Sequence, residues 1–180
     1  VTTANAITLA GSIAVINGLF NFAHGNKAVA LAEIGLGRAS DLADGHVADK
    51  QGTKGRVGRT LDPTMDFIQL GVALPVLVDA NVMPLIPALA IGVPKIIDSA
   101  ATVSAKLRGK ELNPTKEGKW SIAGVWLGIG SFALKATIGR HTPELIDTSL
   151  EVLGWTGTVG GAAYHLPATK EYSVVGFGAT

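Results

Sequence analysis

Residues 67–94 read FIQLGVALPVLVDANVMPLIPALAIGVP and contain one charged residue, Asp79. A run of this kind is long enough to cross a bilayer core, which takes about 20 mainly apolar residues per helix. Three further stretches, 1–26, 120–134 and 152–169, contain no Asp, Glu, Lys or Arg. A chain of 180 residues is too small to bury that many wholly apolar helices in a water-soluble core. We therefore predict an all-α integral membrane protein.

Turn signals between the apolar stretches, such as His24-Gly-Asn and Leu112-Asn-Pro, divide the chain into six helices. We expect all six to be transmembrane and to form a single membrane-embedded domain over residues 1–180. The expected ranges are 4–22, 27–48, 57–80, 84–107, 119–140 and 144–166.

The composition excludes several classes of protein. Charged residues make up 16% of the chain, the net charge is +1 and there is no Cys. A disordered chain would carry fewer apolar residues and a higher net charge, and thiolate metal sites are impossible without Cys. No excess of positive charge is present to bind nucleic acid, so we expect no nucleic-acid partner.

Basic residues gather in two of the connections between the predicted helices. The first holds Lys50, Lys54, Arg56 and Arg59, and the second holds Lys106, Arg108, Lys110, Lys116 and Lys119. With six spans these two connections lie on one face of the membrane. The positive-inside rule predicts that this face is cytoplasmic.

Carboxylates flank the first basic connection. Asp41 and Asp44 are three residues apart, and Asp62 and Asp66 are four apart, so on helices each pair shares a face. A short connection makes the two helices antiparallel neighbours, which brings four carboxylates to one level near the cytoplasmic boundary. Hard oxygen ligands of this kind favour Mg²⁺, Mn²⁺ or Ca²⁺. The alternative interpretation is a pair of solvated helix ends.

Two charged residues lie deeper in the second predicted helix. Glu33 and Arg38 are five positions apart, which is not an ideal helical pairing distance. We expect both to face the bundle interior and to pair there with Lys95, Asp79 or Asp98.

The spacing of the carboxylates resembles the signature of the CDP-alcohol phosphatidyltransferase family, D-x-x-D-G-x-x-A-R-x8-G-x3-D-x3-D. Every interval is preserved, and the specified residues are matched at Asp41, Asp44, Gly45, Ala48, Gly58, Asp62 and Asp66. Members of this family have six transmembrane helices, and the signature spans the second and third. Two further segments are similar to the family: Asn5-Ala-Ile-Thr8-Leu resembles the opening of its first helix, and Gly118-Lys119 resembles the opening of its fifth.

The resemblance implies an enzyme that transfers a phosphatidyl group from a CDP-lipid such as CDP-diacylglycerol to an acceptor hydroxyl, with release of CMP. It implies two divalent ions, Mg²⁺ or Mn²⁺, at a metal site formed by Asp41, Asp44, Asp62 and Asp66, in which the first three are ligands and Asp66 lies close by. Asp66 is also the expected base that takes the proton from the acceptor. The expected binding residues for the donor and the acceptor are Gly45, Ala48, Gly58, Asn5, Thr8 and Lys119.

The chain departs from the family pattern at two positions that matter for the site. The signature Arg after Ala48 is Asp49, and the Arg often found three positions after the first-helix Thr is Gly11. These departures leave the expected metal ligands in place. They change the charge available to the donor phosphates.

The resemblance implies that the acceptor is a small polar or phosphorylated alcohol. Leu61-Asp62-Pro63 resembles the L-D-P of members that form phosphatidylglycerophosphate or cardiolipin, which favours glycerol 3-phosphate; inositol phosphate and phosphatidylglycerol remain open. Lys119 is the cation we expect to meet a phosphorylated acceptor.

Two alternative functions follow from the same residues. The first is a non-catalytic membrane protein of this fold that acts in binding or assembly. The second, an ion transporter, predicts acids spread through the bilayer, whereas the acids here cluster at one boundary. Small residues at Gly154, Gly157, Gly160 and Gly161 allow close helix packing, either within the chain or in a homodimer. Membrane lipids are the remaining expected partners.

Overall fold

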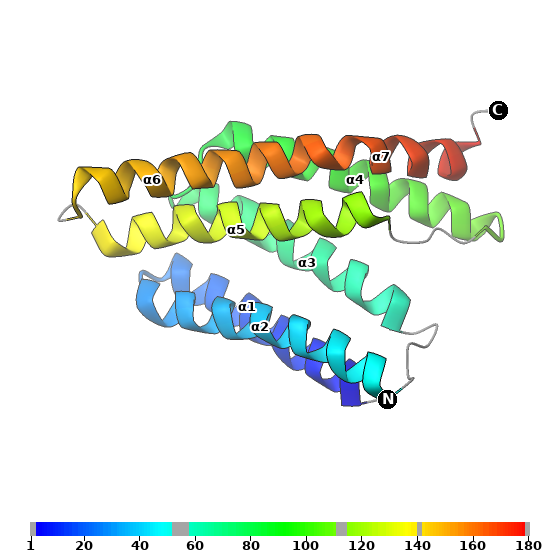
Figure 1. The fold of residues 1–180 in the computed structure, drawn as a ribbon, viewed down its shortest axis with the longest axis horizontal. Helices are drawn as coiled ribbons and strands as arrows, with labels where there is room; N and C mark the ends of the chain where they lie inside the picture. The colour runs from blue at the N-terminus through cyan, green and yellow to red at the C-terminus, as the bar shows by residue number, and fades with distance from the viewer. Residues whose placement is uncertain (1–2, 52–57, 111–114, 140–141, 179–180) are drawn as a thin grey trace. The chain divides into compact units, whose positions relative to one another are not determined.

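The computed structural model describes the backbone of residues 3–51, 58–110, 115–139 and 142–178, with all side chains in these ranges except those of 3–5, 41–51, 58–63, 106 and 119. In this part of the chain every regular element is helical, which confirms the all-α prediction (Figure 1). Contacts divide the chain into two compact units, Val1–Ala80 and Asn81–Thr180, and each is described by itself.

The first unit contains three helices, α1 (Thr3–Ala23), α2 (Lys27–Gln51) and α3 (Gly58–Asp79). The turn between α1 and α2 includes Gly25, whose φ of +84° is accessible to glycine at little cost. α1 packs against both α2 and α3. As Figure 1 shows, α3 runs in the same direction as α1 and opposite to α2.

Glycines bring α1 and α2 into backbone contact. A β-carbon added to Gly37 would lie 2.5 Å from the carbonyl oxygen of Gly11, and one added to Gly18 would lie 2.9 Å from that of Ala30. Small residues at such positions let helix backbones approach closely, which is how helices associate where lipid replaces water.

The buried face of α3 follows the helical period. Leu70, Ala73 and Leu77 are all buried, together with the polar Gln69. These positions recur every three to four residues, so they form one stripe along the helix. This stripe packs against α1 and fixes the rotation of α3, which determines where Asp66 points.

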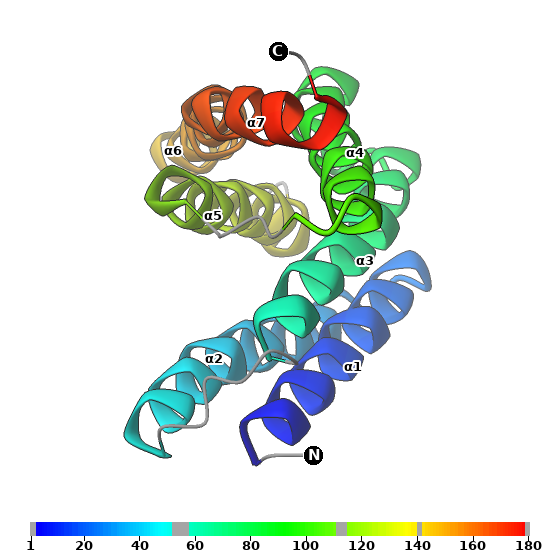
Figure 2. The same cartoon turned by 90° about the vertical axis from the view of Figure 1, so that its right-hand side faces the viewer.

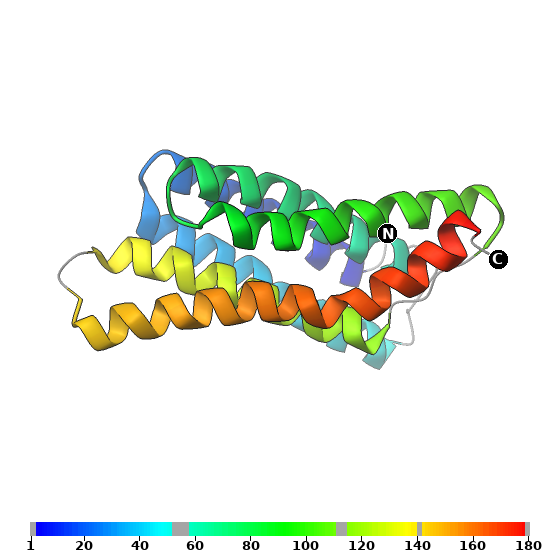
Figure 3. The same ribbon diagram turned by 90° about the horizontal axis from the view of Figure 1, so that it is seen from above.

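The second unit contains α4 (Leu85–Leu107), α5 (Lys116–Ile138), α6 (Glu144–Trp155), the π-helix η2 (Thr156–Gly160) and α7 (Gly161–Phe177). α6, η2 and α7 follow one another without a gap, and Figure 3 shows them as one continuous rod beside α5. α7 contacts both α4 and α5, and the end-on view of Figure 2 shows it next to each of them.

The π-helix lies where α5 comes closest to the rod. A β-carbon on Gly157 would lie 2.7 Å from the carbonyl oxygen of Gly124, and one on Gly128 would lie 2.6 Å from the nitrogen of Thr158. The Ser121 hydroxyl donates to the carbonyl oxygen of Gly161 at 2.7 Å. The predicted small-residue face is therefore used, at least in part, for packing within the chain.

The helix bounds agree with the predicted ranges to within two residues except at three ends. α2 ends at Gln51 rather than 48. α5 begins at Lys116 rather than 119, because the Thr115 side chain caps it by accepting from the nitrogen of Gly118 at 3.0 Å. The last helix was expected to end at 166, and this is wrong, because it continues through Pro167 to Phe177. A proline costs a helix one hydrogen bond, and neighbouring helices can compensate for that loss in membrane bundles.

Three of the described helices are long and apolar enough to span a membrane: Ala6–Ala23 in α1, Leu85–Ala105 in α4 and Lys116–Ile138 in α5. Large apolar side chains on them are exposed, among them Ile13, Leu85, Ile86, Ile96 and Leu127. Exposed apolar surface on this scale is typical of contact with lipid. The six-span prediction is supported to this extent and otherwise stays a prediction.

Candidate active site

The four predicted carboxylates belong to two helices of the first unit, α2 and α3. Asp41 and Asp44 are in the second half of α2, and Asp62 and Asp66 are in the first half of α3. The side chain of Asp66 is described, and those of Asp41, Asp44 and Asp62 lie outside the described part. Among the described side chains, no three His, Asp or Glu lie close enough together to hold a metal ion.

Asp66 is bound by an arginine from α2. Nη1 of Arg38 lies 3.0 Å from Oδ1 of Asp66, and the two side chains are 23% and 26% exposed. The partners expected for Arg38 were Lys95, Asp79 or Asp98, so the structure places this guanidinium at the candidate site instead. Glu33, for which the same partners were expected, accepts from the amides of Asn17 and Asn21, at 2.6 Å and 2.8 Å.

The Arg38–Asp66 contact sets the height of α3 relative to α2, and so the levels at which the aspartates of the two helices lie. From this contact, Asp41 lies about 4.5 Å further along α2, and Asp62 lies about 6 Å back along α3, at 1.5 Å per residue. Because the two helices are antiparallel, both steps lead towards the same end of the unit (Figure 1). Asp41 and Asp62 are therefore on the same side of the contact and at similar levels.

A second contact sets the height of α1 relative to α3. Nε2 of Gln69 on α3 donates to Oγ of Ser12 on α1 at 2.9 Å. Because α1 and α3 run in the same direction, seven residues back from this contact leads to Asn5 on α1 and Asp62 on α3. Thr8, one turn before Ser12, is 5% exposed and lies on the same face of α1. The N-x-x-T segment is thus at the level of the carboxylates, and the Asn5 side chain lies outside the described part.

The predicted small residues lie on the same helix ends. Gly45 and Ala48 are in the last two turns of α2, and Gly58 is the first residue of α3. Their surroundings lie outside the described part, so their expected role in leaving room for the donor stays a prediction.

Lys119 belongs to the second unit, and its side chain lies outside the described part. The backbone around it is described: it is in the first turn of α5, beside the Thr115 cap. The adjacent Gly118 faces His165 of α7, whose Cε1 would lie 3.5 Å from a β-carbon on that glycine.

The structure explains one departure from the family pattern. A β-carbon on Gly11 would lie 1.9 Å from Oγ of Ser40 and 2.9 Å from the carbonyl oxygen of Gly37. No arginine side chain fits at position 11 while α1 and α2 are packed in this way. Among the described side chains, Arg38 is a cation beside Asp66, and sequence spacing missed it because the two residues are 28 positions apart on different helices.

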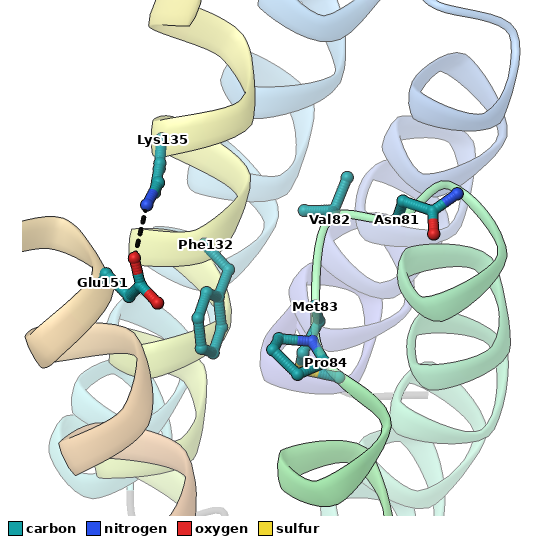
Figure 4. Close-up of a pocket in the computed structure, with 7 residues that line it drawn as sticks. All are labelled: Asn81, Val82, Met83, Pro84, Phe132, Lys135 and Glu151. Carbon is teal, nitrogen blue, oxygen red and sulfur yellow. Dashed lines mark hydrogen bonds and ion pairs between the residues drawn. The ribbon is translucent and has the colours of Figure 1, made fainter. Parts of the chain in front are cut away.

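One cavity of about 210 Å³ lies far along the chain from these residues, in the second unit. Figure 4 shows its lining, which comes from the turn before α4, from α5 and from α6. Lys135 in this lining binds Glu151 at 2.7 Å and Asp147 at 3.0 Å, which ties α5 to α6. Lys135 and Lys119 are about 24 Å apart along α5, at 1.5 Å per residue.

The described part of the chain is all-helical, has three membrane-length apolar helices and carries spaced aspartates in α2 and α3. The model of the CDP-alcohol phosphatidyltransferase family matches residues 1–161. The chain belongs to this family, whose members transfer a phosphatidyl group from a CDP-alcohol and generally use divalent metal ions. No curated protein and no solved structure matches the chain significantly.

The residues present fit a divalent ion by their chemistry and order. Asp41, Asp44 and Asp62 supply hard oxygen donors, which Mg²⁺ and Mn²⁺ prefer. The contacts of Arg38 and Gln69 place the three residues at neighbouring levels of one helix bundle. A diphosphate meeting this many carboxylates would be repelled unless cations lay between them.

Proposed function

We propose that this protein is a divalent-metal-dependent phosphatidyltransferase. It takes the phosphatidyl group from a CDP-lipid of the CDP-diacylglycerol type, passes it to an acceptor hydroxyl and releases CMP. The family match over residues 1–161 carries this proposal. The Arg38–Asp66 contact supports it, because it brings the two halves of the signature together in one unit.

Asp66 is the proposed base. The acceptor oxygen bonds to the phosphorus of the phosphatidyl group, the bond from that phosphorus to the CMP oxygen breaks, and the carboxylate of Asp66 takes the hydroxyl proton. A carboxylate within hydrogen-bonding reach of the reacting hydroxyl can act in this way. Asp66 is suited to it because one oxygen is held by Arg38 and the side chain is still partly exposed, at 26%.

Asp41, Asp44 and Asp62 are the proposed metal ligands, with Asp66 beside them. When bound, Mg²⁺ or Mn²⁺ would neutralise the diphosphate and stabilise the charge on the departing CMP. Gly45, Ala48 and Gly58 leave space for the donor, while Asn5 and Thr8 approach it from α1. Lys119 meets the phosphate of a phosphorylated acceptor, for which glycerol 3-phosphate is the first candidate.

We further propose a multi-pass membrane protein with its site near the cytoplasmic face. The basic residues beside α2 and at the start of α5 support this orientation by the positive-inside rule. The three membrane-length helices support insertion.

The test is transfer by the purified protein in detergent. The protein is incubated with CDP-diacylglycerol, Mg²⁺ or Mn²⁺ and one acceptor at a time: glycerol 3-phosphate, inositol phosphate or phosphatidylglycerol. We expect CMP release with at least one acceptor and a matching lipid product. No CMP with any acceptor would favour the non-catalytic alternative.

A further inference from the structure

Four polar side chains form a continuous hydrogen-bonded chain across the three helices of the first unit. Ser12 on α1 accepts from Gln69 on α3 at 2.9 Å, and Oε1 of Gln69 accepts from Nη1 of Arg38 on α2 at 3.1 Å. The same Nη1 donates to Oδ1 of Asp66 at 3.0 Å. The chain begins at a buried hydroxyl and ends at the carboxylate proposed as the base.

The direction of each hydrogen bond follows from the chemistry of the groups. A guanidinium carries only donors, so the atom of Gln69 that faces Arg38 must be its carbonyl oxygen. The Gln69 amide nitrogen is then turned towards α1, where the Ser12 hydroxyl accepts from it. Gln69 and Ser12 are 1% and 2% exposed, so neither side chain can turn away to water.

We propose that Arg38 is a positioning residue for the proposed transfer, held in place by Gln69 and Ser12. This inference rests on the proposed function of Asp66. Arg38 engages Oδ1 and fixes the rotamer of the carboxylate, so that Oδ2 is directed to the acceptor hydroxyl. Without Arg38, the negative charge of Asp62, one helical turn away, would push the Asp66 side chain out of line.

A merely structural role for Arg38 makes a different prediction. If Arg38 only tied α2 to α3, its loss would lower stability and the affinity for metal and donor together, and any loss of rate would follow from these. A positioning role lowers kcat while the KM values and the metal affinity stay the same. The reason is that a misplaced base affects the reacting geometry and not the binding of the substrates.

The experiment compares the full-length protein in detergent with Arg38→Met, Arg38→Lys and Gln69→Leu. We expect Arg38→Met to lower kcat about 10- to 100-fold, as misplacement of a reacting group does, with both KM values changed less than about twofold. Arg38→Lys keeps the charge and should recover part of the rate. Gln69→Leu leaves Arg38 less restrained and should lower kcat by a smaller factor. Lys27→Met, which removes a charge at the far end of α2, is the control.

Two readouts do not depend on turnover. Binding of Mn²⁺, followed by electron paramagnetic resonance, should be the same in wild type and Arg38→Met. Thermal unfolding of Arg38→Met, Asp66→Asn and the double variant should show a non-additive change in Tm, which reports the contact itself.

The inference is overturned if Arg38→Met keeps the wild-type kcat, or if its loss of rate is matched by a loss of Mn²⁺ binding. Additive Tm changes would also overturn it, because the contact would then be absent. A wild type that releases no CMP contradicts the proposed function instead, and the unfolding cycle still reports whether Arg38 and Asp66 interact.

Discussion

The imidazole of His165 on α7 is hydrogen-bonded through Nε2 to Oδ2 of Asp98 on α4, and both residues are buried, at 3% and 7% exposure. The other polar atoms of the pair, Oδ1 of Asp98 and Nδ1 of His165, have no hydrogen-bond partner among the described groups. The pair joins two apolar helices at a point where nothing else described satisfies these polar groups.

Removing one member of this pair should therefore destabilise the protein. Asp98→Leu leaves Nε2 of His165 without its hydrogen-bond partner, and an unsatisfied buried polar group costs about 1–3 kcal/mol. The double variant Asp98→Leu/His165→Phe should lose less than the sum of the two single changes. Chemical unfolding in detergent measures this, and strictly additive losses would show that the two residues do not interact.

The close approach of α1 and α2 depends on Gly37. Gly37→Ala would place a methyl group 2.5 Å from the carbonyl oxygen of Gly11, which forces the backbones apart. Overpacking of this kind costs about 1–3 kcal/mol. Gly35→Ala is the matched control on the same helix, because a β-carbon there meets nothing within 4 Å. We expect a lower Tm for Gly37→Ala and an unchanged or higher Tm for Gly35→Ala; equal values would contradict the packing.

Substitution of the proposed base should mainly lower kcat, whereas substitution of a proposed metal ligand should mainly weaken metal binding. Asp66→Asn should lower kcat by roughly 10²- to 10⁴-fold, the usual contribution of a general base. Asp62→Asn should weaken Mn²⁺ binding more than Asp66→Asn does, because Asp62 is the ligand and Asp66 lies beside the ions. Turnover assays and Mn²⁺ titrations measure the two effects. If Asp66→Asn kept full turnover, the base assignment would be wrong.

The role of Lys119 depends on the acceptor. Lys119→Met should raise KM for glycerol 3-phosphate by about tenfold, which corresponds to about 1.4 kcal/mol of lost binding. The KM for CDP-diacylglycerol should stay the same. Lys170→Met, an exposed lysine on α7, serves as the control for a change of net charge. Equal effects of the two substitutions would mean that Lys119 acts only through the membrane surface.

The sequence was sufficient to predict the positions of the helices. Charge-free stretches set their centres, and turn residues such as Gly25 set most of their ends. The end of the last helix was predicted wrong because Pro167 is tolerated inside a continuous rod. A local pattern cannot show that packing against α4 and α5 holds the rod together.

The signature spacing predicts a set of site residues, which stays a prediction, and it does not show how Asp66 is held. Arg38 and Gln69 bind each other across 31 positions of sequence, and Gln69 and Ser12 across 57. Such pairs have no periodicity, so only the packing of three helices reveals them. The sequence likewise shows only that position 11 lacks the family arginine. It does not show that the packing of α1 against α2 leaves no room for one.

The central claim is that the carboxylates of α2 and α3 support a metal-dependent transfer. The most direct measurement is CMP release from CDP-diacylglycerol by wild type and Asp62→Asn, with and without a chelator of divalent ions. The account predicts that wild type releases CMP only when acceptor and Mg²⁺ or Mn²⁺ are both present, and that Asp62→Asn releases little. CMP release that is unaffected by the chelator, or equal in the two proteins, would contradict it.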